Sequence, residues 1–281
     1  MALRVYSWGC TDVGMKRDHN EDSYLLAPDM NLFVVADGMG GHAGGEMASG
    51  IAVRTVESHV REHKDLIEPD LNHEGAIQDS PVAKLLSDAV RGACAAVFEK
   101  SREIRELEGM GTTTTTIIFH NNYAFVAHVG DSRAYLVREG RILQLSEDHS
   151  LVNEQLKAGL ITDAQARQSR FKNIITRSVG FEADVEVDVI AVEVKSGDAF
   201  LMCSDGLCNL VTEPEMADIV LDNFLHRAPE ILIDLANQRG GDDNITVVLN
   251  YVVDEAEVAW DDGSASAEVI PGGAAFNAGN T

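Results

Sequence analysis

Apolar residues follow two different spacings along this chain, and the two spacings predict different elements. Short runs rich in Val, Ile, Phe and Thr are typical of β-strands, whether they alternate with polar residues or are apolar throughout. Such runs occupy residues 5–11, 23–27, 31–36, 112–119, 123–129, 134–138, 141–145, 185–194, 199–203 and 245–253. The Glu139-Gly140 pair is expected to form a tight turn between two of these strands.

Apolar positions that recur every three or four residues predict helices. The strongest pattern begins at Ser80-Pro81, because Ser at the N-cap followed by Pro at the first helical position is a start signal. Gly109 is the expected end of this helix. Further helices are expected over about 45–60, after the capping box at 212–215 and over 229–238, with a weak helical pattern at 150–170.

The order of these elements indicates the fold class. Blocks of strands bracket pairs of helices, whereas a doubly wound sheet would show regular alternation, so the class is α+β. The composition changes after Val253, since residues 254–281 hold six acidic residues and no basic one. We therefore expect one folded domain over 1–253 and an acidic, disordered tail over 254–281.

The net charge excludes some classes of partner. The 281 residues carry a formal net charge of -24, which repels the phosphates of nucleic acids and of anionic membranes. We therefore expect neither as a partner. No stretch approaches the roughly 20 apolar residues that span a bilayer, and the first ten residues lack the apolar region of a signal peptide.

The cysteines favour a reducing compartment. Cys10, Cys94, Cys203 and Cys208 form no CxxC pair and no zinc-binding spacing, and three of the four lie in apolar runs. Together with the absence of a targeting segment, this predicts a cytoplasmic protein.

Four acidic turns, each at the end of an apolar strand, are the strongest chemical signal. They contain Asp37, Asp131, Asp205 and Asp243. One such Asp is usually a turn residue or a helix cap, but strands packed side by side can bring several to one place. Carboxylates gathered in this way require cations, and oxygen ligands favour Mg²⁺ or Mn²⁺. Gly38 would let the backbone approach an ion, and its carbonyl is itself a possible ligand.

An arginine precedes these turns in the polar stretch at residues 17–22. The planar, permanently charged guanidinium of Arg17 suits phosphate oxygens. An arginine beside a two-metal carboxylate site indicates a phosphoryl substrate, although the stretch in isolation would also fit a solvated loop.

At this point the residues resemble a known family, the type 2C, metal-dependent serine/threonine protein phosphatases, in their bacterial branch. Each motif is short, but six occur in the family's order and span nearly the whole of residues 4–252. The motifs are RDHNED at 17–22, DGMGGHAG at 37–44, GTTTT at 111–115, GDSR at 130–133, SDGL at 204–207 and GGDDNIT at 240–246.

The resemblance implies a four-layer αββα sandwich of two antiparallel sheets flanked by helices. It also implies two Mn²⁺ or Mg²⁺ ions, with a possible third. Asp37 would bridge two ions, the Gly38 carbonyl would bind one of them, and Asp205 and Asp243 would bind the other. Asp22 would act mainly through metal-bound water, with Glu21 nearby.

Further roles follow from the same resemblance. Asp131 and Asp205 would hold the third, weaker ion, Arg17 would hold the substrate phosphate, and residues 149–172 would form a flap beside the site. The implied protein is a monomer that dephosphorylates phosphoproteins and opposes a serine/threonine kinase in bacterial signalling. Its two ions would lower the pKa of a bridging water, which attacks phosphorus directly.

One departure from the family concerns the general acid. Many eukaryotic members have a histidine directly after the Asp-Gly pair, whereas this chain has Met39 there and His42 three residues on. The acid that protonates the leaving group therefore stays unassigned. The role of His149 also stays open, between contact with the substrate and a structural hydrogen bond.

Two rival functions have sequence support. Residues 38–43 fit the GxGxxG/A pattern of dinucleotide-binding enzymes, with Glu57 at the expected acidic position, although no βαβ unit follows. The second rival is a pseudophosphatase that keeps the fold as a binding module. The complete set of acidic residues argues against it, and a turnover assay with Mn²⁺ separates the two.

Overall fold

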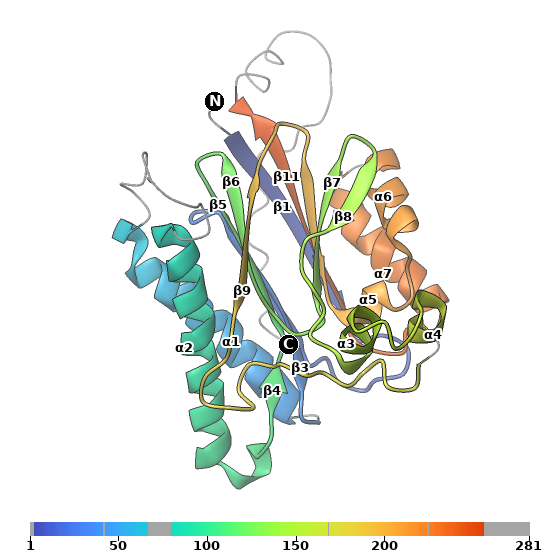
Figure 1. The fold of residues 1–281 in the computed structure, drawn as a ribbon. Helices are drawn as coiled ribbons and strands as arrows, with labels where there is room; N and C mark the ends of the chain where they lie inside the picture. The colour runs from blue at the N-terminus through green and yellow to red at the C-terminus, as the bar shows by residue number, and fades with distance from the viewer. Residues whose placement is uncertain (1–2, 42, 67–79, 168, 224, 256–281) are drawn as a thin grey trace.

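Two antiparallel sheets pack face to face at the centre of the molecule, and helices cover both outer faces (Figure 1). The computed structural model describes residues 3–255 except 42, 67–79, 168 and 224. The four-layer α+β sandwich expected from the sequence is thus confirmed.

The first sheet has five strands and is covered by two helices. Its strand order is β1-β11-β10-β7-β8. The strands are β1 (Leu3–Asp12), β11 (Ile245–Asp254), β10 (Ala199–Cys203), β7 (Arg133–Arg138) and β8 (Arg141–Gln144), and the helices are α6 (Glu213–Asp222) and α7 (Ala228–Gln238).

The second sheet is covered by the two longest described helices. Its main path is β2-β3-β5-β6-β9, and the short strand β4 pairs with β3. The strands are β2 (Asp22–Ala27), β3 (Leu32–Met39), β4 (Gly111–Thr112), β5 (Thr114–His120), β6 (Tyr123–Val129) and β9 (Asp188–Glu193), and the helices are α1 (Ala43–Glu62) and α2 (Pro81–Glu103).

Three short helices lie near one end of the sandwich, close to the end of β3 (Figure 1). They are α3 (Leu151–Lys157), α4 (Asp163–Arg167) and α5 (Asp205–Cys208). Within the described residues, the single-turn 3₁₀ helices are η1 (Lys64–Leu66), η3 (Arg105–Leu107) and η4 (Leu225–Arg227). The acidic turns of the sequence fall at this same end.

Side-chain alternation along β10 explains why its residues form a central strand. Phe200 and Met202 pack between the sheets, whereas Leu201 and Cys203 pack under the outer helices, and all are fully buried. A strand with both faces covered is apolar throughout, because successive side chains point to opposite faces.

Several local signals act as the sequence predicts, and one does not. The Ser80 side chain accepts a hydrogen bond from the Ala83 N–H (3.2 Å) and caps α2. Glu139 (φ 51°) and Gly140 (φ 74°) both have positive φ, as the tight turn between β7 and β8 requires. Gly109 does not end the helix, however.

The α2 helix ends at Glu103, six residues before the expected glycine. Ile104 follows in an extended conformation, with φ -124° and ψ 112°, and the chain then enters η3. Gly109 has φ +81° and lies just beyond η3, so the glycine marks the end of that short turn.

The sheet topology rules out the dinucleotide-binding alternative. A Rossmann-type site needs a parallel βαβ unit around the glycine-rich turn. Here β3 precedes the turn and pairs antiparallel with β2, β4 and β5. Glu57, the candidate ribose ligand, lies on α1, where it accepts a hydrogen bond from Arg61 (3.0 Å).

The described end of β11 gives a test of the proposed domain boundary. The strand pairs with β1 from Leu3↔Asp254 to Asp12↔Ile245, one residue beyond the boundary expected at 253. We predict that a chain cut after Glu255 keeps its Tm and its activity, because every pair of this ladder remains. A chain cut after Val248 should fail to fold, because it loses six of the ten pairs of the ladder. Differential scanning calorimetry checks both, and a large fall in Tm for the longer chain would contradict the boundary.

Candidate active site

The register of two strands places two carboxylates opposite each other. Asp22 begins β2 and Asp37 lies near the end of β3, and their Cα atoms are paired across the ladder. Directly opposed like charges destabilise an antiparallel pair. Asp22 is only 8% exposed, so water does little to screen this repulsion.

Three further aspartates reach the same place from other segments. Asp131 follows β6 in the turn to β7, Asp205 begins α5 directly after β10, and Asp243 immediately precedes β11. Each of them acts electrostatically on Asp37, as Asp22 does. The structure therefore brings together the five aspartates that the sequence analysis singled out.

The electrostatic consequence is a set of carboxyl groups that resist ionisation. Burial is the largest cause and raises the pKa of Asp37 well above its ordinary value, and the four neighbouring carboxylates raise it further. Burial likewise raises the pKa of Asp22 to about 7, with contributions from Asp205 and Asp243. The folded chain thus holds protons here that an unfolded chain would release.

The same effect extends to the other side of the site. Burial, followed by Asp205 and Asp148, raises the pKa of Asp131 to about 8. For Asp205, burial and Asp243 raise the pKa to about 6, although Lys172 opposes them. Carboxyl groups with raised pKa values near several like charges are typical of functional sites.

Hydroxyl groups hold one oxygen of Asp22 and leave the other without a partner. Its Oδ2 accepts hydrogen bonds from Ser204 Oγ (2.8 Å) and Thr246 Oγ1 (2.7 Å). Its buried Oδ1 has no hydrogen-bond partner among the described residues, and the same is true of Asp205 Oδ1. A buried acceptor without a partner is costly, so these two oxygens point to an absent ligand.

Asn244 joins the loops that carry the acidic residues. Its Oδ1 accepts from the Glu21 N–H (2.7 Å), and its Nδ2 donates to the carbonyls of Val13 (2.9 Å) and His19 (2.8 Å). Asn244 is only 3% exposed. It therefore fixes the loop before β2 against the loop that contains Asp243.

Gly38 is required by close backbone contact. Its N–H donates to the Glu21 carbonyl (3.2 Å), and a Cβ at this position would overlap the carbonyl oxygens of Gly45 and Glu21. A larger residue would separate β3 from α1 and from the start of β2. Met39, which follows the Asp-Gly pair, ends β3, and His42 lies outside the described residues.

Arg17 lies against the acidic site. Its Nη2 donates to Asp243 Oδ2 at 2.7 Å, and the two side chains are 46% and 29% exposed. If residues 17–22 formed only a solvated loop, Arg17 would pair with a neighbouring acid. Its observed partner is instead 226 residues away in the sequence. An exposed pair of this kind contributes about 0–1 kcal/mol, so the guanidinium can exchange partners at little cost.

These features fit cations that keep part of their hydration shell. The donors are all oxygens, two buried oxygens have no partner among the described residues, and burial together with the neighbouring carboxylates raises the pKa values. As the side chains stand, no three acidic, histidine or cysteine side chains within the described residues are close enough to hold one ion by themselves, so an ion would draw the carboxylates closer and complete its shell with water. Mg²⁺ commonly uses one or two carboxylates and several waters, so this arrangement suits it.

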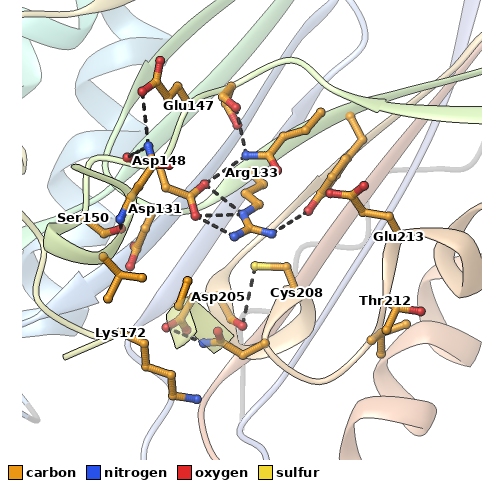
Figure 2. Close-up of a pocket in the computed structure, with 18 of the residues that line it drawn as sticks. Asp131, Arg133, Glu147, Asp148, Ser150, Lys172, Asp205, Cys208, Thr212 and Glu213 are labelled. Atoms are coloured by element: carbon orange, nitrogen blue, oxygen red, sulfur yellow. Dashed lines mark hydrogen bonds and ion pairs between the residues drawn. The ribbon is translucent and has the colours of Figure 1, made fainter. Parts of the chain in front are cut away.

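A cavity of about 730 Å³ adjoins the aspartates. Asp131 and Asp205 lie toward one side of it, and Thr212 and Glu213 toward the other (Figure 2). The segment predicted as a flap forms part of its wall. The residues of that segment that line the cavity are Ser150, Val152, Asn153, Leu156, Ala166 and Lys172.

Arg133 forms the charged floor of this cavity (Figure 2). Its Nε and Nη2 donate to the two carboxylate oxygens of Asp148 (2.8 and 2.6 Å), and its Nη1 donates to the Tyr135 hydroxyl (3.1 Å). A bidentate pair of this kind fixes both side chains. Arg133 is therefore already engaged and serves to shape the cavity.

Sequence reasoning missed the residues that orient the acids. Ser204, Thr246 and Asn244 lie within the SDGL and GGDDNIT motifs but were given no role. Their partners are Asp22 and Glu21, at least 182 residues away in the chain. A signal was present, since small polar residues adjacent to the acidic turns are natural hydrogen-bond donors.

Comparison with known proteins finds relatives that cover most of the chain. The family model of Protein phosphatase 2C matches residues 15–237. A serine/threonine phosphatase stp of Listeria monocytogenes is 37% identical over 243 residues, which cover 85% of this chain and 92% of that protein. The protein phosphatase PhpP of Streptococcus pneumoniae is 37% identical over 248 residues, 85% of this chain and 94% of that protein.

Solved structures show the same fold. The serine/threonine phosphatase PstP/Ppp of Mycobacterium tuberculosis matches with a TM-score of 0.78 and 32% identity, over 89% of this chain and 99% of that one. The PstP catalytic domain in complex with two manganese ions matches with a TM-score of 0.76 and 33% identity, over 90% and 100%. The chain belongs to the protein phosphatase 2C family.

The raised pKa values predict how pH changes the stability of the metal-free protein. The pKa values of Asp22, Asp131 and Asp205 are about 7, 8 and 6 in the folded chain, above the value near 3.9 of an unfolded Asp. The folded state therefore binds more protons, and the free energy of unfolding must fall as pH rises from about 5 to 8.

Tm measured across this pH range in the presence of a chelator checks the prediction. Asp131→Asn should flatten the slope, because it removes one of the three groups. Asp184→Asn serves as the control, since Asp184 is an exposed carboxylate paired with Arg91. Saturating Mn²⁺ should raise Tm most at the higher pH. A Tm that rises with pH in the chelated protein would contradict the electrostatic description.

Proposed function

We propose that this chain hydrolyses phosphoserine and phosphothreonine in proteins, with the aspartate cluster holding two Mn²⁺ or Mg²⁺ ions. The observation that carries the proposal is the convergence of five aspartates, two of which have a buried oxygen without a partner in the described part of the chain. When bound, such ions would neutralise the phosphoryl oxygens and supply an activated water. Membership of the protein phosphatase 2C family supports the same reaction.

The positions of the side chains support the ligand roles that the family resemblance implies. Asp37 is under the influence of all four other aspartates, which suits a carboxylate shared by two ions. The Gly38 carbonyl would bind one ion, and Asp205 and Asp243 the other. Asp22 keeps Oδ1 available while two hydroxyls fix Oδ2, which suits contact through an intervening water.

Arg17 would hold the substrate phosphate. Its present partner, Asp243, is one of the proposed ligands. An ion bound by Asp243 would draw that carboxylate away from the guanidinium, and the freed N–H groups could then donate to phosphate oxygens. The neighbouring cavity would accept the part of the substrate chain beside the phosphorylated residue. Asp131 and Asp205, in its wall, would hold a third and weaker ion.

The protein's partners follow from this activity. We propose phosphoprotein substrates, an opposing serine/threonine kinase, and action as a cytoplasmic monomer. The charge of -24 argues against nucleic acid and anionic membrane as partners. No helix in the described part of the chain is both long and apolar enough to cross a membrane.

We predict that loss of a proposed ligand abolishes turnover without unfolding the protein. Asp37→Ala and Asp243→Ala should each lower kcat by more than about 100-fold, since the ions contribute several kcal/mol to the transition state. Each change also relieves repulsion, so the Tm of the metal-free variants should not fall.

The matched control is Asp198→Asn. Asp198 is more deeply buried than Asp37 or Asp243 but pairs with Arg138 away from the site, so this variant should lose Tm while it keeps its kcat. The assay uses a phosphothreonine peptide with saturating Mn²⁺ and, in parallel, a chelator. Wild-type kcat in either ligand variant, or full activity of the wild type after exhaustive chelation, would exclude the proposed metal site.

A separate prediction concerns Arg17. Arg17→Ala should raise KM for the phosphopeptide, with a loss of roughly 1.5–3 kcal/mol in kcat/KM, the range for a hydrogen bond to a charged group. Arg17→Lys should recover only part of this loss, because an ammonium cannot reproduce the planar fork. Affinity for Mn²⁺ should stay near that of the wild type.

Steady-state kinetics with a parallel Mn²⁺ titration measures both quantities. Arg61→Ala is the control. Arg61 lies on the outer helix α1, is about as exposed as Arg17, and forms ion pairs with Asp29 and Glu57. An unchanged KM in Arg17→Ala would remove Arg17 from the phosphate site.

A further inference from the structure

Two histidines supply the hydrogen-bond partners of the N–H and of the carbonyl of Gly130. Gly130 lies in the turn after β6, directly before Asp131, and has φ +115°. Its N–H donates to His149 Nδ1 (3.0 Å). Its carbonyl accepts from the backbone N–H of His149 (2.7 Å) and faces His128 Nε2 (3.0 Å). His128 is fully buried, and His149 is 8% exposed.

The partners determine which nitrogen of each ring carries the proton. A backbone N–H can only donate, so Nδ1 of His149 must accept, and the neutral ring carries its proton on Nε2. That Nε2 faces Asp188 Oδ2 (3.1 Å), an acceptor. Arg177 Nη1 lies 3.0 Å from the same nitrogen and donates instead to Asp188 Oδ1 (2.7 Å).

His128 shows the same tautomer for the same reason. Its Nε2 faces the carbonyls of Gly130 and Glu147, each at 3.0 Å, and carbonyls can only accept. Its Nδ1 then accepts from the Thr115 hydroxyl (3.0 Å). Burial lowers the pKa of both histidines, that of His128 to about 4, so both rings are neutral near pH 7.

His149 also lies at the base of the flap segment. Its carbonyl accepts from the Thr176 N–H (2.9 Å), and next to it the Leu151 N–H donates to the Ile174 carbonyl (2.9 Å). These bonds join the start of the flap segment, residues 149–172, to the residues that directly follow its end. One residue therefore contacts the turn that carries Asp131, the ends of the flap segment and the Arg177–Asp188 pair.

We propose that His149 is a positioning residue that sets the direction of Asp131, and through it the affinity of the third and weaker ion. The hydrogen bond from the Gly130 N–H to Nδ1 is the contact responsible. This N–H belongs to the peptide between Val129 and Gly130, so a rotation of that peptide would shift the adjoining Asp131 and redirect its carboxylate within the cavity wall. This inference rests on the proposed function only in taking Asp131 as a ligand.

Two substitutions of His149 test the contacts of its two ring nitrogens separately. In His149→Asn, Oδ1 stands as many bonds from the backbone as Nδ1 and can still accept from the Gly130 N–H. In His149→Gln, the side-chain amide reaches the position of Nε2 and the partner Asp188, but leaves the Gly130 N–H without an acceptor. Both variants keep a neutral polar side chain, so a difference between them reports the Gly130 contact.

The experiment titrates Mn²⁺ into protein that a chelator has stripped of metal. The electron paramagnetic resonance signal of free Mn²⁺ reports how much of the ion stays unbound. We expect the two tight ions to be unchanged in both variants. The dissociation constant of the weaker ion should rise by roughly tenfold or more in His149→Gln, as loss of a buried hydrogen bond implies, and should stay near that of the wild type in His149→Asn. Asp188→Asn weakens the Nε2 contact and the Arg177–Asp188 pair but leaves the Gly130 contact in place, so this variant should keep the weaker ion.

The outcomes distinguish this inference from the proposed function. Equal affinity for the weaker ion in the Asn and Gln variants, or loss of the tight ions in the Gln variant, would overturn the role of His149. Absence of a weaker ion in the wild type would overturn it as well. A wild type that binds no Mn²⁺ tightly and does not hydrolyse phosphopeptide would instead defeat the proposed function. Tm of each variant, measured in parallel, shows that it is folded.

Discussion

The repulsion between aspartates at one end of the sandwich is the constraint to which the rest of the site responds. Asp22 and Asp37 are paired directly across an antiparallel ladder, and three more carboxylates act on Asp37. Neither strand could slip by one residue to separate them, because a slip would turn every core side chain of β2 and β3 toward the wrong face. Packing of the core therefore enforces an arrangement that the charges alone oppose, and protons or cations must relieve it.

The polar groups around the aspartates are arranged to hold this unfavourable geometry. Ser204 and Thr246 each donate to Asp22, and Asn244 joins the loop before β2 to the loop before β11. Gly38 allows β3, α1 and the start of β2 to approach one another more closely than any side chain would permit. A site preorganised in this way binds its ions without paying for rearrangement of the loops, which suits a site that must present charge to a phosphoryl group.

Local chemistry could be predicted from the sequence better than contacts between distant segments. Alternation located the strands, Ser80 located the start of α2, and Glu139-Gly140 located a turn, because each signal acts within a few residues. The end of α2 was misplaced because Gly109 serves the 3₁₀ turn that follows the helix. The acidic turns could be named as a group, but their mutual placement depends on the register of both sheets. The partner of Arg17 and the two histidines around Gly130 were beyond local reasoning for the same reason.

Anomalous X-ray scattering from crystals grown with Mn²⁺ tests the central claim most directly, because it locates the ions independently of activity. Convergence of the aspartates predicts two strong peaks beside Asp37, each within ligand distance of its carboxylate, with Asp243 and Asp205 contacting one ion and the Gly38 carbonyl the other. A weaker third peak should lie near Asp131. Crystals of active protein that show no manganese within ligand distance of Asp37 would contradict the account.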